Sequence, residues 1–169
     1  MDLKLKSISR SGVGEAIAKA ELYRFLNEPG ETESICRDVL AVDPDNQKAI
    51  RILGLAITDR FTGSASDRFA EAESVFARLS DAYEKLYYAG LLHERRAKAQ
   101  LRAGNEPHTV IVLFEEAMRL FAAAEKIRPE GNDDAILRWN RCVRLIQSRS
   151  AADWEREREI FEASDSPPV

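Results

Sequence analysis

The sequence predicts an all-α fold in which antiparallel helix hairpins stack into an α-solenoid. Residues 36–57 contain the end of one amphipathic helix, a turn at Pro44 and the start of a second helix, and residues 121–143 repeat this pattern around Pro129. In both stretches apolar residues recur at the i, i+3, i+4, i+7 spacing of a helix face. No stretch alternates polar and apolar residues with period two, so we expect no sheet. Helix–turn–helix units that recur along a chain are typical of repeat proteins.

Composition limits the classes of partner. At 169 residues, with 44% hydrophobic and 32% charged residues, the chain suits one domain that buries roughly 70% of its unfolded surface. A net charge of −4 argues against nucleic acid as a partner. The two cysteines fall on apolar helix faces, where a reduced thiol is expected. The longest apolar runs are far below the roughly 18 residues of a membrane span, and no signal-peptide pattern is present. We therefore expect a cytoplasmic protein without a membrane partner.

Turn residues set the boundaries of the first four helices. The helices are expected at about 14–26, 31–42, 46–61 and 67–79. Residues 1–13 are polar and predict a flexible N-terminal arm. Residues 27–30 stop the first helix with strong turn chemistry, Pro44 stops the second, and Asn46 can cap the third. Residues 62–66 form a loop longer than a tight turn, which we expect to be the least ordered internal segment.

Caps also set the later helices, expected at about 81–103, 107–127 and 132–147. Asp81 followed by Glu84 is the spacing of a capping box. Gly104 ends the fifth helix, and Pro107 opens the sixth at a first-turn position where its missing N–H costs nothing. The predicted helical domain is thus 14–148, followed at 149–169 by a charged helix and a disordered tail. The large apolar residues of that last segment are Trp154, Ile160 and Phe161.

These units resemble tetratricopeptide repeats. Residues 13–46 form a unit of about 34 residues, the length of that repeat. Ala20, Gly54 and Gly90 take the family's small-residue position in successive units, and Pro44 closes the first. The resemblance covers about three degenerate repeats with a capping helix and implies a right-handed superhelix of helix hairpins. The loop at 62–66 and the missing closing proline of the second unit depart from the pattern.

The two glycines of this position imply tight packing. Glycine inside a helix costs about 1 kcal/mol relative to alanine. Close approach of a neighbouring helix at Gly54 and Gly90 can offset that cost.

The resemblance also implies a binding site. Proteins of this family bind an extended peptide or a partner helix in a concave groove lined by the first helix of each unit. The matching positions form a candidate peptide-binding groove made of Arg24, Lys48, Arg51, Leu55, Tyr87, Leu91, Arg95 and Arg141. The same lining includes Ile17, Glu21, Phe25, Asp59, Glu84, Glu94, Leu137 and Arg144.

The charge of this lining suggests a kind of ligand. Basic residues slightly outnumber acidic ones, which favours an anionic ligand such as an acidic segment or a C-terminal carboxylate. A solvated face of mixed charge is the alternative. The lysine and asparagine set with which co-chaperones of the family hold a terminal carboxylate is replaced by Ile17 and Glu21, so that particular ligand is not expected.

No catalytic, cofactor or metal site is predicted. His93-Glu94 begins like a zinc-protease motif, but Ala97 occupies the position of its second histidine. His93 fits a buried core position with a hydrogen-bond partner. Aromatic residues at helical spacing, here Tyr83, Tyr87 and Tyr88, are more typical of a core than of a base-stacking platform.

We therefore expect a non-enzymatic protein–protein interaction module that binds a peptide or helix of another protein. Two alternatives remain open. The chain could be a small cytoplasmic chaperone or escort of an exported or aggregation-prone client. It could also be a structural homo-oligomer assembled through the C-terminal segment with Trp154, Ile160 and Phe161.

Overall fold

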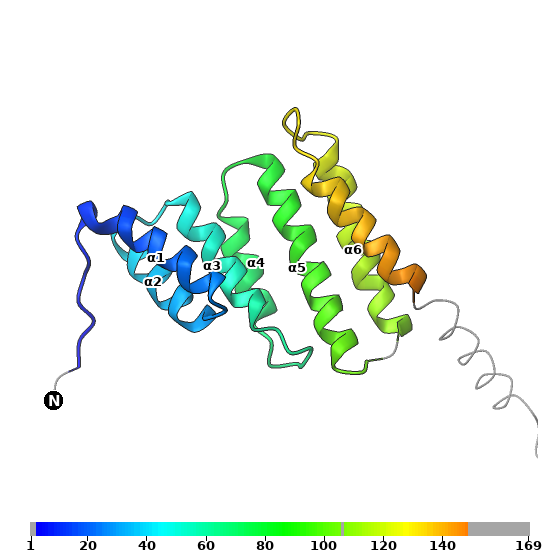
Figure 1. Cartoon of the computed structure of the whole chain (residues 1–169), viewed down its shortest axis with the longest axis horizontal. Helices are drawn as coiled ribbons and strands as arrows, with labels where there is room; N and C mark the ends of the chain where they lie inside the picture. Colours follow the sequence, from blue (N-terminus) through cyan, green and yellow to red (C-terminus); the bar gives the residue numbers. More distant parts are fainter. Residues whose placement is uncertain (1–2, 106, 149–169) are drawn as a thin grey trace, which may run out of the picture.

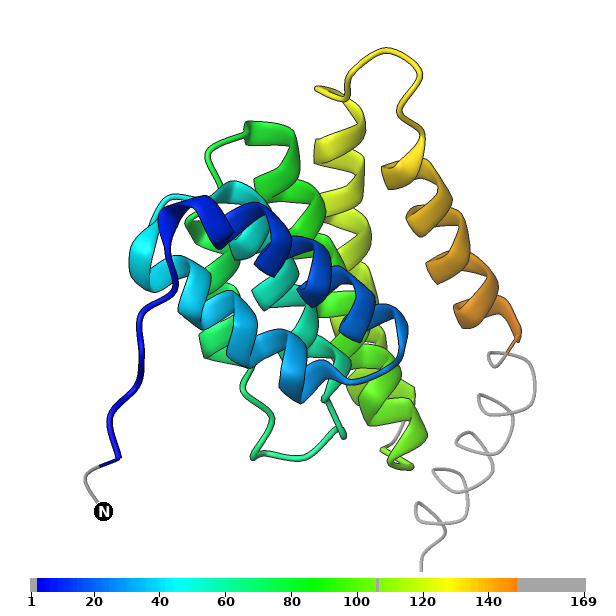
Figure 2. The ribbon, with the colours of Figure 1, turned by 60° about the vertical axis from the view of Figure 1, so that its left-hand side comes forward.

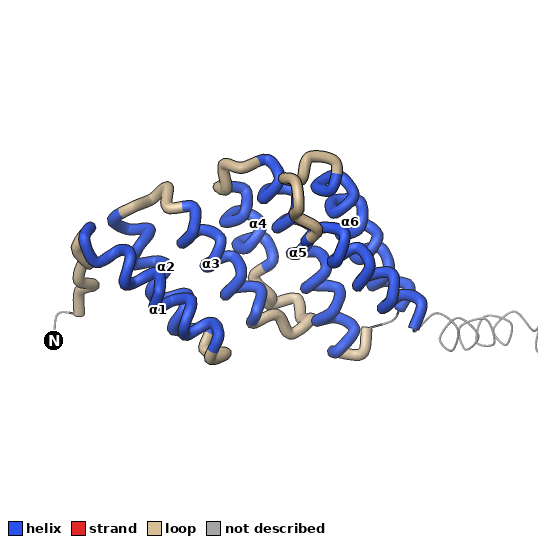
Figure 3. The backbone as a smooth tube through the Cα atoms, turned by 45° about the horizontal axis from the view of Figure 1, so that its top comes forward, coloured by secondary structure: helices blue, strands red, loops and turns tan. Residues whose placement is uncertain are grey.

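The chain folds into helices connected by short loops. The computed structural model describes residues 3–105 and 107–148, and within these ranges it contains no strand (Figure 3). The elements are a 3-10 turn Arg10–Gly12, α1 Val13–Phe25, α2 Pro29–Val42, α3 Gln47–Asp59, α4 Phe69–Ala77, α5 Ala82–Arg102, α6 Pro107–Glu125 and a helix over residues 134–148. The all-α prediction is confirmed. The predictions for residues 149–169 lie outside the described residues.

Side-chain caps start α3 and α5 at the predicted turns. The Asn46 side chain accepts a hydrogen bond from the Ala49 amide at 3.0 Å, and Asp81 accepts one from the Glu84 amide at 2.8 Å. These bonds satisfy amide groups that have no partner inside the helix. The capping box is only half formed, because the Glu84 carboxylate binds Arg51 of α3. The Asp81 cap therefore sets the start of α5 as predicted. The Glu84 side chain contacts α3 instead of completing the capping box.

α4 begins at Phe69, two residues later than predicted, because Asp67 is used by the preceding loop. The Asp67 carboxylate accepts hydrogen bonds from the amides of Thr62 and Gly63 at 2.9 and 2.7 Å. Gly63 has φ of +88°, and a Cβ there would lie 2.6 Å from the Ala99 carbonyl oxygen of α5. The loop we expected to be least ordered is thus closed by hydrogen bonds and packed against α5.

The helices form a row in chain order (Figure 1). Each helix from α1 to α6 contacts the next one, and contacts also join α1 to α3 and α3 to α5. The 134–148 helix packs on α5 and α6, since its Ala135 and Cys142 belong to the same buried cluster as Leu91 and Phe114. Figure 2 shows the row from the α1 end. No helix within the described ranges is both long enough and apolar enough to cross a lipid bilayer.

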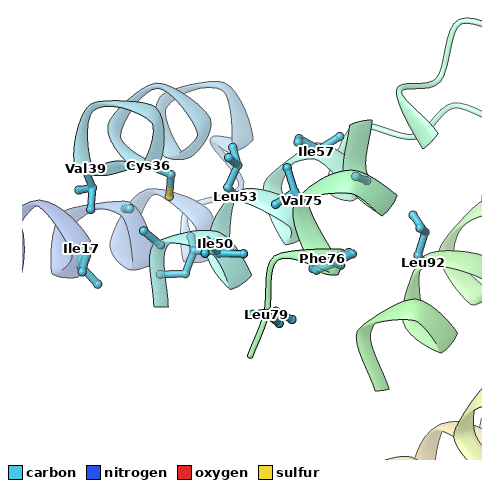
Figure 4. Close-up of a cluster of buried hydrophobic side chains, with 14 of the residues drawn as sticks. Ile17, Cys36, Val39, Ile50, Leu53, Ile57, Val75, Phe76, Leu79 and Leu92 are labelled. Carbon is cyan, nitrogen blue, oxygen red and sulfur yellow. The ribbon is translucent and has the colours of Figure 1, made fainter. Parts of the chain in front are cut away.

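The core consists of two clusters that meet at α5. The first cluster is built by α1 to α4 and includes Leu92 of α5 (Figure 4). The second is built by α5, α6 and the 134–148 helix. Leu55 of α3 and Tyr88 of α5 are partly buried and pack against both clusters. Apolar burial therefore continues along the row without a break.

Both glycines of the predicted small-residue position lie under an aromatic ring of the following helix. A Cβ on Gly54 would lie 2.3 Å from Cε1 of Phe76, and one on Gly90 would lie 2.8 Å from Cε1 of Phe121. Both rings are buried, with 2% and 0% exposure. The predicted close approach is confirmed, and the same contact recurs in successive hairpins.

The two cysteines are free and buried, as expected. Burial is the main cause that raises the pKa of each thiol to about 12. A thiol with such a pKa is almost entirely protonated at neutral pH and is a poor nucleophile.

Candidate functional site

The residues predicted to line a groove come from α1, α3, α5 and the 134–148 helix, and we call the surface that they build the lining face. These helices alternate along the chain with α2, α4 and α6. Contacts join α1 to α3 and α3 to α5, and Arg138 of the 134–148 helix contacts Tyr87 and Glu94 of α5, so the four helices lie side by side.

Ion pairs join α1 to α3 across this face. Lys48 Nζ lies 2.9 Å from Glu21 Oε2, and both side chains are half exposed. Arg24 donates from Nε to Asp59 Oδ2 at 2.8 Å. Exposed pairs of this kind contribute little to stability, but they hold the arginine and lysine side chains along the surface.

α3 is joined to α5 in the same way. Arg51 Nη2 donates to Glu84 Oε1 at 2.5 Å. Arg95 binds Asp59 as well, and it donates to Thr58 Oγ1 at 2.6 Å and to the Leu55 carbonyl oxygen at 3.2 Å. Burial lowers the pKa of Arg95, and the charge of Asp59 acts against this. The Asp59 carboxylate therefore accepts hydrogen bonds from two arginines, Arg24 of α1 and Arg95 of α5.

A buried carboxylate on α5, that of Glu94, pairs with an arginine of the 134–148 helix. Glu94 is fully buried and forms ion pairs with Lys98 and with Arg138, whose Nη1 lies 3.5 Å from Glu94 Oε2. Arg138 also donates from Nε to the Tyr87 hydroxyl at 3.4 Å. A buried carboxylate needs such partners because its desolvation is costly.

These ion pairs neutralise most of the positive charge that was predicted for the lining. Arg24, Lys48, Arg51 and Arg95 each have a carboxylate partner inside the lining face. Arg141 is exposed and has no carboxylate partner among the described residues. The positive charge is thus largely balanced within the face, and this reduces the support for an acidic ligand.

Some predicted lining residues are not accessible, which corrects the prediction. Leu91 is 2% exposed and belongs to the second core cluster. Ile17 is buried in the first cluster, and Glu94 is buried between helices. They are buried because they lie on the sides of their helices that pack against neighbouring helices. In contrast, Phe25 and Leu137 are 88% and 63% exposed.

A hollow of about 500 Å³ opens where α3, α5 and the 134–148 helix begin. Its volume lies in the range of small-molecule and side-chain pockets. The residues around it are Gln47, Ser80, Asp81, Tyr83, Glu84, Tyr87, Tyr88, Pro129, Asn132 and Asp134.

Three tyrosines of α5 make most of the apolar wall. The ring centroids of Tyr83 and Tyr87 lie 5.8 Å apart in a stacked arrangement, and those of Tyr87 and Tyr88 lie 5.1 Å apart edge to face. The Tyr83 hydroxyl donates to Asn132 Oδ1 at 3.1 Å. The core role predicted for these rings is confirmed, since all three pack in the second cluster. Sequence reasoning missed that the same rings line a hollow.

His93 differs from its prediction. It is half buried, with its ring centroid 5.3 Å from that of Phe69, and its buried Nδ1 has no hydrogen-bond partner within the described part of the chain. Burial is the main cause that lowers the pKa of His93. The side chain borders a separate hollow of about 350 Å³ between α4 and α5. No histidine, cysteine, aspartate and glutamate residues in the described ranges gather in a group of three that could hold a metal ion.

Comparison with protein-family models, with curated proteins and with solved structures finds no match to this chain. The functional assignment therefore rests on the lining face and its hollow.

Proposed function

We propose that this protein is a non-catalytic interaction module that binds a segment of another protein along the lining face. The observation that carries the proposal is the placement of α1, α3, α5 and the 134–148 helix side by side, with inter-helix ion pairs along their shared surface and a hollow of about 500 Å³ in it. Helical repeat proteins use surfaces of this kind to bind extended segments.

The architecture that we propose is a right-handed superhelix of tetratricopeptide-like hairpins. Three features support it: the row of helices in chain order, the contacts between alternate helices, and the repeated packing of a helix glycine under an aromatic ring at Gly54 and Gly90. In such a superhelix the lining face is the concave side.

A pair of matched substitutions tests the binding face. Leu137 on the lining face and Val112 on α6 are both exposed aliphatic residues, at 63% and 61%. We expect Leu137→Glu to weaken capture of a crosslinked partner from native lysate at least about tenfold, because a charge would be desolvated in the interface. Val112→Glu should leave capture unchanged, and both variants should keep the helical circular dichroism of the parent.

Equal capture by the parent and by Leu137→Glu would remove the lining face as the binding surface. Loss of capture with Val112→Glu alone would place the partner on the side of α6 instead. Captured species should be identified by mass spectrometry, and their affinity should be measured with the purified partner.

A further inference from the structure

The hollow in the lining face has aromatic and acidic walls. Asp81, Glu84 and Asp134 contribute carboxylates, and none of the described residues that line it is a lysine or arginine, although Arg51 and Arg138 donate hydrogen bonds to Glu84 and Tyr87 of the lining. Asp81 uses one oxygen to cap α5, and Glu84 accepts a hydrogen bond from Arg51. The Asp134 carboxylate is exposed and makes no ion pair or hydrogen bond with described residues. One full negative charge is therefore available at the mouth of a tyrosine-lined hollow.

The electrostatics of the tyrosines agree with this picture. Burial raises the pKa of Tyr88 to about 12; the largest charge effect is that of Arg51, which lowers this pKa, and Glu84 and Asp134 raise it by smaller amounts. Burial and then Asp134 also raise the pKa of Tyr83. Both hydroxyls stay protonated, and the nearby charge that they sense from the 134–148 helix is negative. The Asp134 charge would repel an anion that enters the hollow on the side of the 134–148 helix.

The faces of tyrosine rings attract cations. The negative face of an aromatic ring attracts an ammonium or guanidinium group within about 6 Å of the ring centre. A carboxylate beside the ring adds a charge-assisted hydrogen bond. A neutral apolar side chain would gain only burial and would leave the Asp134 carboxylate without a partner.

We infer that this hollow binds a lysine or arginine side chain of the partner segment, held beside Asp134 and against the tyrosines that line the hollow. This inference rests on the proposed function and makes it specific, since the partner would carry a basic anchor residue. It differs from the acidic ligand that the sequence suggested, because the arginines that suggested it are paired with carboxylates of the lining face.

The test uses short blocked peptides of known chemistry. Ac-Gly-Arg-Gly-NH2 and Ac-Gly-Lys-Gly-NH2 are titrated into the 15N-labelled full chain, and citrulline and norleucine versions serve as neutral isosteres. We expect saturable amide shifts centred on residues 81–88 and 132–137 with the basic peptides, and affinities for the neutral peptides that are about tenfold weaker.

Two substitutions connect the binding to Asp134. Of the arginine and lysine peptides, the one that binds the parent more tightly is used here. Asp134→Asn should weaken its binding about threefold, and Asp134→Lys should weaken it further. The matched control is Glu15→Gln, which also removes a negative charge in the first turn of a helix but lies in α1. The control should bind like the parent.

Equal binding of the arginine and citrulline peptides would overturn the inference, and so would parent-like binding by Asp134→Lys. Either result leaves the proposed function standing if Leu137→Glu still loses the captured partner. Conversely, saturable binding of the basic peptide together with unchanged capture by Leu137→Glu would reject the lining face as the partner surface while keeping the cation site.

Discussion

At the scale of single residues, the hydrogen-bond partners of a charged side chain determine its pKa and its contribution to stability. Glu33 of α2 is buried and accepts two hydrogen bonds from Arg68, Nη1 to Oε1 at 2.8 Å and Nη2 to Oε2 at 2.6 Å. Arg37 donates from Nη2 to the same carboxylate at 2.7 Å. The hydrogen bond from Arg68 is the largest cause that lowers the pKa of Glu33 to about 2, against the opposing effect of burial. Bidentate arginine pairs of this kind are stronger than single surface contacts.

Glu33 should therefore make stability depend on pH in the acid range. Its pKa is lower in the folded chain than the ordinary 4.5, so its contribution is complete above pH 4.5 and disappears as the pH falls toward 2. We expect Glu33→Gln to lower the free energy of unfolding by about 1 to 2 kcal/mol at pH 7, after allowance for the half-exposed arginines. Urea denaturation between pH 2 and 8 should show the difference from the parent shrinking below pH 4.5. A difference that stays constant down to pH 2.5 would contradict this assignment, and Glu15→Gln is the surface control.

At the scale of helices, packing overrides intrinsic preference. Gly54 and Gly90 sit inside helices, where alanine would be favoured by about 1 kcal/mol. The ring of Phe76 blocks a Cβ at Gly54, and it cannot move easily because it is stacked on Tyr88 with a centroid distance of 5.2 Å. The packing of the Phe76 ring against α3 therefore depends on the missing side chain at Gly54.

Alanine should lower the stability of the fold at Gly54, where a ring blocks the Cβ, and raise it at Gly14, where nothing does. Gly54→Ala is expected to destabilise the fold by about 1 to 3 kcal/mol, because overpacking exceeds the gain in helix propensity. Gly14→Ala in α1 meets nothing within 4 Å and should stabilise the fold by about 0.5 to 1 kcal/mol. Thermal and urea unfolding of the two variants measure the contrast. If both variants were stabilised, the close approach of Phe76 would be refuted.

At the scale of the whole molecule, Asp59 connects three helices of the row. It accepts hydrogen bonds from Arg24 of α1 and Arg95 of α5, while itself belonging to α3. The Arg95 side chain is only 20% exposed. Removing its partner would leave a largely buried guanidinium with only neutral acceptors.

Asp59→Ala is thus expected to cost about 1 to 2 kcal/mol of unfolding free energy. Glu21→Ala should cost less than about 0.5 kcal/mol, because Glu21 and Lys48 are both 49% exposed. Denaturant unfolding, monitored by circular dichroism, measures the unfolding free energy of the two variants. Equal losses would show that Asp59 acts only as a surface residue.

Much of the fold was predictable because its signals are local. Asn46 and Asp81 cap helices through their own side chains, Pro107 opens one, and period-3.6 patterning marks the buried faces. Each of these acts within a few residues along the chain. The start of α4 was not predicted, since Asp67 could serve either as a helix residue or as the residue that closes the 62–66 loop.

The candidate site was predictable only in part. The helices that carry it were placed correctly, but Leu91 proved to be buried and four of the basic residues proved to be paired. The acidic and aromatic hollow was missed because its walls come from separate segments, among them the start of α5 and the start of the 134–148 helix. The spacing of Tyr83, Tyr87 and Tyr88 was the one signal that pointed toward it.

By itself, the amino-acid sequence determined the all-α class, the positions of most helix ends and the two glycines that let helices approach closely, because propensity, capping and periodicity act over short distances. The tertiary structure alone decided which charges neutralise one another, which apolar lining residues are covered, and where tyrosines and a carboxylate gather around a hollow. Those outcomes depend on distances between residues about 30 to 50 positions apart, as in the pairs Arg51 with Glu84 and Tyr83 with Asn132. Such distances exist only after the helices have packed.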